Sequence, residues 1–203
     1  MQTTGTRRRQ ARGIKTEEKV LDAAEHLMQT KGFDAAQVSN IVELSGVSVG
    51  SFYHHFGSKD AVIHRLVHRF CAQGRARVDE LDLASMSPDQ ALEAVVRATI
   101  DQFRTNPELY GSVAARLDTE PEIWVPMRDL RRYYEDLLIA RLDQEGTPSR
   151  DQVEATMQTV LAVLTHAVIF GSMPLTLDDG DADARLIRIA RAVMASEAAS
   201  GEG

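Results

Sequence analysis

Residues 45–60, SGVSVGSFYHHFGSKD, combine small residues with a cluster of aromatic rings and a single lysine. Gly46 lies between two segments that read as short helices, about residues 38–44 and about residues 48–54, and this arrangement is typical of a helix-turn-helix. The second helix of such a motif can enter a DNA major groove about 12 Å wide. The residues expected to face inward and hold the two helices together are Ile41, Leu44, Val47 and Phe52.

The outward side of the second helix has the side chains that a DNA-binding surface needs. Three small residues would let the backbone approach DNA closely: Ser48, Gly50 and Ser51. Three ring donors would contact phosphates, which fix the register of a protein on DNA: Tyr53, His54 and His55. Lys59 adds a cation beside a helix that Ser58 caps, where backbone N–H groups also favour a phosphate.

The rest of the chain also predicts helices. Capping boxes at Ser87–Gln90 and Ser149–Gln152 begin two of them, and Asn106-Pro107 begins another. An alternating strand pattern is absent from the sequence. The predicted fold is therefore all-α, with nine or ten helices.

Composition divides the chain and limits its class. The net charge is −7, but residues 1–69 carry ten Lys+Arg and seven Asp+Glu, so this part is +3 and the remainder −10. Residues 1–14 hold four arginines and no acid, and they predict a flexible basic arm. The single Cys71 excludes an internal disulfide, the apolar run 161–171 is too short to span a bilayer, and a signal segment is not evident. A cytoplasmic protein without a membrane partner or cofactor is expected.

Residues 32–67 resemble the DNA-binding domain of the TetR family of bacterial transcriptional regulators. The matching elements follow one another in order: Gly32-Phe33, Ile41, Gly46-Val47-Ser48, Gly50, Phe52-Tyr53, His55-Phe56 and Ser58-Lys59-Asp60. The resemblance implies a three-helix DNA-binding domain over residues 15–74, with the helix-turn-helix at about 37–56. It also implies a larger helical domain over 75–203 that binds an effector and forms a homodimer through the last two long helices.

The resemblance also assigns roles to residues. Positions corresponding to Tyr53, His55 and Lys59 usually contact phosphates, whereas Ser48, Val49, Ser51 and His54 lie on the recognition helix. Ser39 lies where the first short helix can reach a base. Gln37 stands where the family usually has a capping Thr or Ser, and Val49 replaces a position that is often polar, which favours contact with a thymine methyl group.

The effector pocket is expected to be largely apolar, with a few polar groups from the middle helices. Its candidate residues are Phe103, Tyr110, Arg116, Trp124, Met127, Tyr134, His166 and Phe170. The default interpretation of each, His166 included, is an ordinary core residue. The dimer interface is expected on the helices at 149–172 and 181–197, with an apolar stripe at Val153, Met157, Val160, Leu164 and Val168 that Leu161 and Ile169 widen.

His64, His68 and Cys71 form a second, weaker constellation. Their i, i+4 and i+7 spacing places them on one helical face, and their ligand types suit zinc or copper. A fourth ligand is not evident, so plain surface histidines beside a core cysteine are the competing interpretation.

The sequence thus predicts a dimeric regulator, interpreted as a repressor, that a small-molecule effector releases from a palindromic operator. An activator is a further alternative, because the protein sequence does not distinguish the two. The alternative is a helical small-molecule-binding protein or enzyme whose helix-turn-helix is vestigial. The sequence lacks a metal-ligand signature, a Gly-rich phosphate loop and a nucleophile elbow, and this argues against an enzyme.

Overall fold

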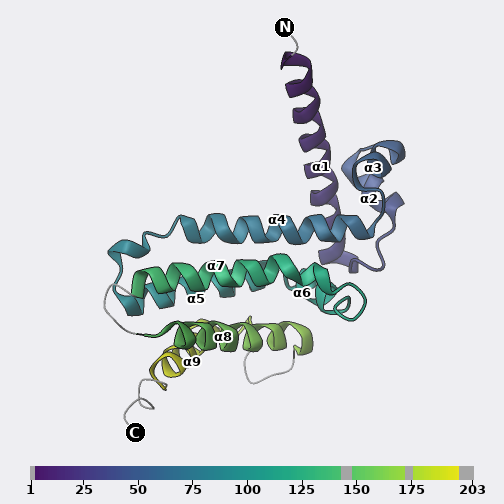
Figure 1. Ribbon diagram of the computed structural model, residues 1–203. Helices are drawn as coiled ribbons and strands as arrows, with labels where there is room; N and C mark the ends of the chain where they lie inside the picture. Colours follow the sequence, from purple (N-terminus) through teal and green to yellow (C-terminus); the bar gives the residue numbers. More distant parts are fainter. Residues whose placement is uncertain (1–2, 143–147, 172–175, 197–203) are drawn as a thin grey trace. The chain divides into compact units, whose positions relative to one another are not determined.

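The computed structural model describes residues 3–142, 148–171 and 176–196, and every regular element among them is helical (Figure 1). Nine α-helices and two short 3-10 helices follow one another in these segments. The prediction of an all-α fold with nine or ten helices is therefore confirmed for the described residues. The chain divides into two compact units, unit 1 at Met1–Arg69 and unit 2 at Phe70–Gly203.

Unit 1 contains α1 (Thr3–Lys31), α2 (Val38–Ser45), α3 (Val49–Phe56) and the first half of α4 (Asp60–Asp79). Its core is formed by apolar side chains that are almost completely buried: Val20, Ala24, Met28, Phe33, Ile41, Phe52, Val62 and Ile63. On α1, Val20, Ala24 and Met28 recur every four residues, so this helix places one stripe inward.

Helix α1 begins earlier than the sequence suggests. Residues 1–14 predict a flexible arm followed by a helix capped at Thr16, whereas α1 starts at Thr3 and continues through Thr16 without interruption. The physical reason is local, since Arg, Gln and Ala are good helix formers and proline is absent from this stretch.

Unit 2 contains the second half of α4, followed by seven further elements. These are η1 (Leu83–Ser85), α5 (Pro88–Thr105), α6 (Pro107–Ala114), η2 (Pro121–Trp124), α7 (Val125–Leu142), α8 (Arg150–Phe170) and α9 (Ala182–Ser196). Both predicted capping boxes are present: Ser87 N–H donates to Gln90 Oε1 at 2.9 Å, and Ser149 N–H donates to Gln152 Oε1 at 2.6 Å. Helix α8 packs against α9, α7, α6 and α5, and α9 also packs against α5.

The apolar stripe of α8 belongs to the core of the chain itself. Val153, Met157, Val160 and Leu164 are all fully buried within one copy of the protein. Because α9, α5 and α7 already cover this stripe, it is not free to form the dimer interface for which the sequence suggested it. Val168, the last residue of the predicted stripe, is only partly buried. Of the two residues expected to widen the stripe, Leu161 is partly buried and Ile169 is exposed.

By length and composition, α8 could also cross a membrane. The expectation based on residues 161–171 considered too short a segment, because α8 has 21 residues. A core helix of a soluble protein has the same composition, and α8 packs against four other helices of unit 2.

Candidate nucleic-acid interface and ligand cavity

The turn between α2 and α3 is fixed by a glycine and two caps. Gly46 ends α2 with φ of +65°, a left-handed conformation that favours glycine. Ser48 then caps α3, because its Oγ accepts a hydrogen bond from Ser51 N–H at 3.2 Å. At the start of α2, Asn40 Oδ1 accepts from Gln37 N–H at 3.0 Å, so Asn40 supports this end of the helix although Gln37 replaces the expected Thr or Ser.

Aromatic packing sets the orientation of α3. Phe52 is completely buried, and the Phe56 ring stacks on it with centroids 5.5 Å apart. Ile41 on α2 is also completely buried, as predicted. The prediction that Leu44 faces inward is wrong, because 51% of its surface is exposed. The neighbouring Ser45 is buried instead, where its hydroxyl donates to Val42 O and accepts from Val47 N–H.

Packing of Phe52 and Phe56 leaves the other side of α3 exposed. Val49 keeps 54% of its surface accessible and Tyr53 keeps 50%. The predicted DNA-contacting residues that are exposed are Gln37, Ser39, Ser48, Val49, Gly50, Tyr53 and His54. The structure therefore gathers these residues along α3 and the start of α2 on the accessible surface of unit 1.

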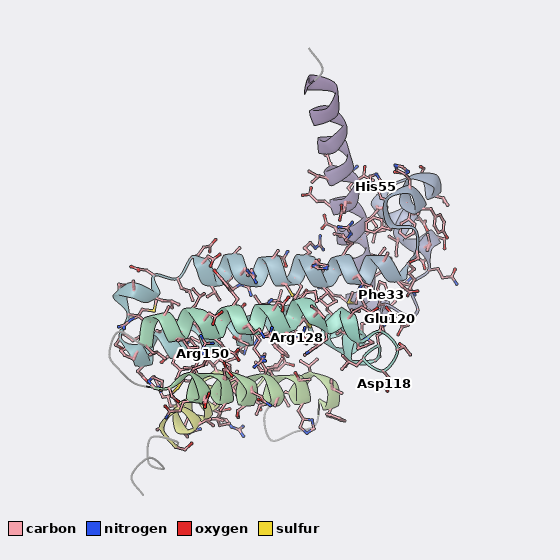
Figure 2. The ribbon with its side chains drawn as sticks, in the orientation of Figure 1. Phe33, His55, Asp118, Glu120, Arg128 and Arg150 are labelled. Carbon is pink, nitrogen blue, oxygen red and sulfur yellow. The ribbon has the colours of Figure 1, made fainter. Side chains whose placement is uncertain are left out.

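Three predicted DNA-contacting residues, Ser51, His55 and Lys59, are half-buried. The Lys59 ammonium donates to Asp34 O at 3.0 Å and lies 4.9 Å from the centre of the Phe33 ring. Phe33 is labelled in Figure 2. Lys59 is thus held at the connection between α1 and α2, with further N–H groups free to donate.

Ion pairs reduce the number of cations that unit 1 can offer to phosphates. Arg69 on α4 forms salt bridges with Asp22, at 2.6 Å, and with Glu25. Arg65 lies 3.5 Å from Glu17. Arg65 and Arg69 are paired with acids of α1, so they are less available to phosphates. The exposed residues of α3 itself are mostly neutral.

Unit 2 encloses a cavity of about 530 Å³ between α5, α6, η2, α7 and α8. Seven of the eight residues predicted for an effector pocket line it: Phe103, Tyr110, Trp124, Met127, Tyr134, His166 and Phe170. Arg116 is not among the lining residues, and its guanidinium donates to Ser112 O at 2.9 Å near the end of α6.

Sequence reasoning missed six polar residues that line the cavity. The six are Thr99, Gln102, Arg128, Arg131, Gln158 and Thr165. Several lie one turn from a residue that was predicted, as Thr99 does from Phe103 and Arg131 from Met127. Helical spacing was therefore the signal that could have found them.

A hydrogen-bonded chain lies in the buried wall of the cavity. Tyr134 O–H donates to Gln102 Oε1 at 2.8 Å, and Gln102 Nε2 donates to Phe70 O on α4 at 3.0 Å. The Tyr110 ring stacks on Phe103 with centroids 3.7 Å apart and meets the Phe70 ring edge-on. Burial raises the pKa of Tyr110 and of Tyr134, so both phenols remain neutral donors.

One of the two cavity arginines is neutralised within the protein. Arg131 Nη1 lies 2.7 Å from Glu135 Oε1, and the Glu135 side chain is only 3% exposed. Burial raises the pKa of Glu135, while the positive charge of Arg131 opposes that rise. The pair therefore adds little net charge to the cavity.

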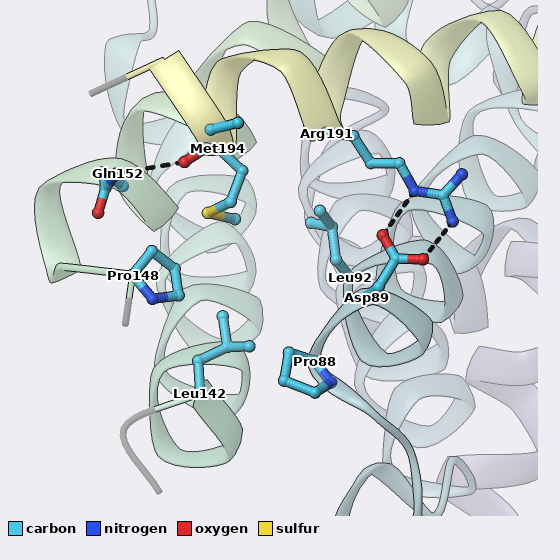
Figure 3. A pocket seen from close by; sticks show the side chains of 9 residues that line it. Pro88, Asp89, Leu92, Leu142, Pro148, Gln152, Arg191 and Met194 are labelled. Atoms are coloured by element: carbon cyan, nitrogen blue, oxygen red, sulfur yellow. Dashed lines mark hydrogen bonds and ion pairs between the residues drawn. The ribbon is translucent and has the colours of Figure 1, made fainter. Parts of the chain in front are cut away.

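A smaller cavity of about 360 Å³ lies where α5, α7, α8 and α9 meet (Figure 3). Arg191 lines this cavity, and its guanidinium already donates to both Asp89 carboxylate oxygens at 2.6 Å and to Glu93 at 2.8 Å. Gln152 Nε2 donates to Met194 O across it at 3.2 Å. Since its charged groups satisfy one another, this cavity offers little to a polar ligand.

The candidate metal constellation on α4 is not assembled. Cys71 is buried and His68 is exposed. Burial raises the pKa of the Cys71 thiol to about 12, which disfavours the thiolate that binds metals. In the part of the chain that the structure describes, three or more His, Cys, Asp or Glu side chains do not come together as a metal site.

Comparison with known proteins agrees with this geometry. Residues 20–66 match the model of the bacterial regulatory proteins of the tetR family. The HTH-type transcriptional regulator UidR of Escherichia coli (strain K12) is 25% identical over 157 residues, which cover 76% of this chain and 80% of UidR. The HTH-type transcriptional repressor AcnR of Corynebacterium efficiens is 23% identical over 164 residues, covering 78% of this chain and 80% of AcnR.

Solved structures share the fold. A TetR-family transcriptional regulator from Mesorhizobium loti superposes with a TM-score of 0.74 at 17% identity, covering 93% of this chain and 98% of that protein. A transcriptional regulator from Rhodococcus sp. gives a TM-score of 0.70 at 21% identity, covering 89% and 96%. The matched helix-turn-helix, the relatives along most of the chain and the shared helical fold all support the TetR family of bacterial transcriptional regulators as the family of this protein.

Proposed function

We propose that this transcriptional regulator is a repressor that binds a palindromic operator as a homodimer and is released by a small-molecule effector. The observation that carries the proposal is the exposed side of α3. Val49, Tyr53 and the small residues around Gly50 are accessible there, while Phe52 and Phe56 anchor the helix from behind. A helix held in this way can present side chains to a major groove.

The cavity of unit 2 is proposed as the effector site. Its volume of about 530 Å³ falls in the range of pockets for small ligands, and its lining is mostly apolar with a few polar groups. A second candidate, an enzymatic active site in this cavity, is not favoured, because its buried tyrosines are held as neutral donors rather than activated groups.

The wall of this cavity offers a route to the DNA-binding unit. Gln102 lines the cavity and also donates to the Phe70 carbonyl of α4, the helix that contributes to both units. An effector that displaces Gln102 or Tyr110 would therefore disturb α4 at the residue where unit 2 begins. Such a disturbance would couple ligand binding to operator binding, in the sense of linkage between two sites.

The dimer interface is proposed on the sides of α8 and α9 that the core leaves open. Thr159 and Val163 on α8, with Ile189 and Val193 on α9, are partly exposed although small or apolar. Two such helices from each copy would form a four-helix bundle. Dimeric helix-turn-helix proteins place their recognition helices about one DNA turn apart, ~34 Å, which would match a palindromic site.

Selection from a random duplex library tests the operator part of the proposal. Purified protein should enrich an inverted repeat over several rounds, because two identical α3 helices read two half-sites. A Tyr53→Ala and Val49→Glu double variant serves as the control and should enrich no repeat. Enrichment of an unpaired half-site, or of no motif by the unaltered protein, would refute a dimeric operator reader.

A further inference from the structure

We infer that the effector of this cavity is an amphipathic anion, an apolar body that carries one carboxylate-like head group. The inference rests on the proposed function, because it names the class of ligand that the proposed effector site selects. Three features of the cavity support it: an apolar closed end, an unbalanced cation at the mouth, and a buried ring nitrogen without a partner.

The closed end of the cavity suits an apolar body. Phe103 and Tyr110 are only 1% and 6% exposed, and their stacked rings form one wall with Met127 and Leu130 beside them. An apolar group placed here leaves water entirely, which is worth about 25 cal/mol for each Å² buried. Other lining residues, Arg128 and Phe170 among them, are exposed, and they mark the mouth of the cavity.

Arg128 gives the mouth a net positive charge (Figure 2). Its neighbour on the same wall, Arg131, is balanced by Glu135, whereas the described residues include no hydrogen-bond or ion-pair partner for Arg128. Asp and Glu are also missing from the described residues that line the cavity. The Arg191 guanidinium of the smaller cavity shows the contrast, because three carboxylate contacts already satisfy it.

His166, on the α8 wall, supplies the third feature. Its Nδ1 atom is buried, and among the described residues it has no hydrogen-bond partner. The ring meets Phe170 edge-on at 4.4 Å, a contact that does not use this nitrogen. Buried polar atoms rarely remain unpaired, and a polar group of a bound ligand would provide the partner.

The aromatic lining alone would also accept a cation, since ring faces attract positive charge. Arg128 opposes that choice, because a ligand cation at the mouth would be repelled by the guanidinium. If Arg128 selects the ligand, the cavity should prefer an anion. If the aromatic rings select it, the cavity should prefer a cation.

Trp124 provides a direct measurement of ligand binding. It is the single tryptophan of the chain and it lines the cavity, so its fluorescence reports occupancy. The full chain is titrated with two series that share a body and differ in charge: biphenyl-4-carboxylate, its carboxamide and the 4-aminomethyl compound, then decanoate, decanamide and decylamine. In at least one series the carboxylate should bind about fivefold more tightly than the amide, and the amine most weakly.

Two variants assign the preference to Arg128. Arg128→Gln should reduce the ratio of carboxylate to amide affinity to about one while leaving amide binding unchanged. Arg132→Gln removes the same charge from the same helix at an exposed position outside the cavity lining, and it should keep the ratio. Raising the salt concentration should lower the ratio for the unaltered chain, because an exposed charge is screened.

The inference is overturned if the amides bind as tightly as the carboxylates in both series, if no member of either series binds, or if Arg128→Gln keeps the preference. The titrations contain no DNA, so they test the ligand class independently of operator binding. A chain that prefers the carboxylates but binds no operator would refute the proposed function and leave the ligand class standing. A chain that binds its operator but shows no carboxylate preference would refute this inference only.

Discussion

The residues of the proposed DNA surface are mostly small or neutral. Ser48, Gly50 and Ser51 bring the α3 backbone close to whatever it contacts, while Arg69 is engaged by acids of α1. Lys59 is the cation next to this surface, and its ammonium is positioned by the Asp34 carbonyl and the Phe33 ring. Such a surface would gain affinity from close approach and hydrogen bonds more than from accumulated charge.

Lys59→Ala should weaken binding to every DNA sequence alike and lower the salt dependence of binding by about one unit of slope, because one phosphate contact is lost. Anisotropy titrations at four salt concentrations measure that slope. Lys31→Ala, which removes an exposed lysine at the end of α1, serves as the control for charge loss. An unchanged slope for Lys59→Ala at equal thermal stability would remove Lys59 from the contacts.

Val49 belongs to a different class of contact, because an exposed apolar side chain in the first turn of α3 can meet a thymine methyl group. Val49→Lys should change which base is preferred at one position of each half-site, by about 1–3 kcal/mol of discrimination. Binding to a set of single-base operator variants checks this. A uniform loss of affinity with the same preferred base would mean that Val49 does not read bases.

At the scale of elements, helix ends and the turn were predictable, since their signals are local. Ser87 and Ser149 form their capping boxes as the sequence indicates, and Gly46 takes the left-handed conformation that the turn requires. The start of α1 at Thr3 was not predictable from the same signals, because a basic composition fits both a flexible arm and a helix.

Packing partners were harder to predict than helices. Periodicity shows that a face of α8 is apolar, but it does not show whether that face meets its own chain or a second copy, and Val153 to Leu164 meet their own chain. Leu44 and Ser45 occupy adjacent positions near one face of α2, so only the structure decides which is buried. The aromatic cavity residues were found because large rings stand out, whereas Leu130, Gln102 and Arg128 were not distinctive in sequence.

Close approach of α4 and α5 depends on a missing side chain. A Cβ at Gly74 would overlap the amide of Gln102, whose two hydrogen bonds join Tyr134 and Phe70. Gly74→Ala should therefore lower the free energy of unfolding by about 1–3 kcal/mol, because the buried amide loses its partners.

Urea unfolding followed by circular dichroism measures the effect of Gly74→Ala. Gly111→Ala is the matched control, since Gly111 also lies within a helix but a Cβ there meets nothing within 4 Å. The control should be neutral or more stable by up to about 1 kcal/mol, as helix propensity predicts. Equal effects at the two positions would show that the Gln102 contacts contribute little to stability.

At the scale of the whole molecule, the proposed function requires that two copies present two α3 helices together. Thr159→Arg places a charge on the proposed bundle face of α8 and should convert the dimer to a monomer, with a loss of operator affinity of at least tenfold. Sedimentation or light scattering measures the mass. Ala184→Arg, at an exposed position of α9 away from the proposed bundle face, should leave the dimer intact, and a dimeric Thr159→Arg variant would place the interface elsewhere.

The central claim is that α3 reads a specific DNA sequence. The measurement that tests it most directly is fluorescence anisotropy of the purified chain on duplex DNA from upstream of its own gene, beside a scrambled duplex, at two salt concentrations. Binding to the genuine duplex should be at least a thousandfold tighter than to the scrambled one and should weaken as salt rises. Equal affinity for both duplexes at both salt concentrations, with Val49→Lys making no difference, would contradict the claim.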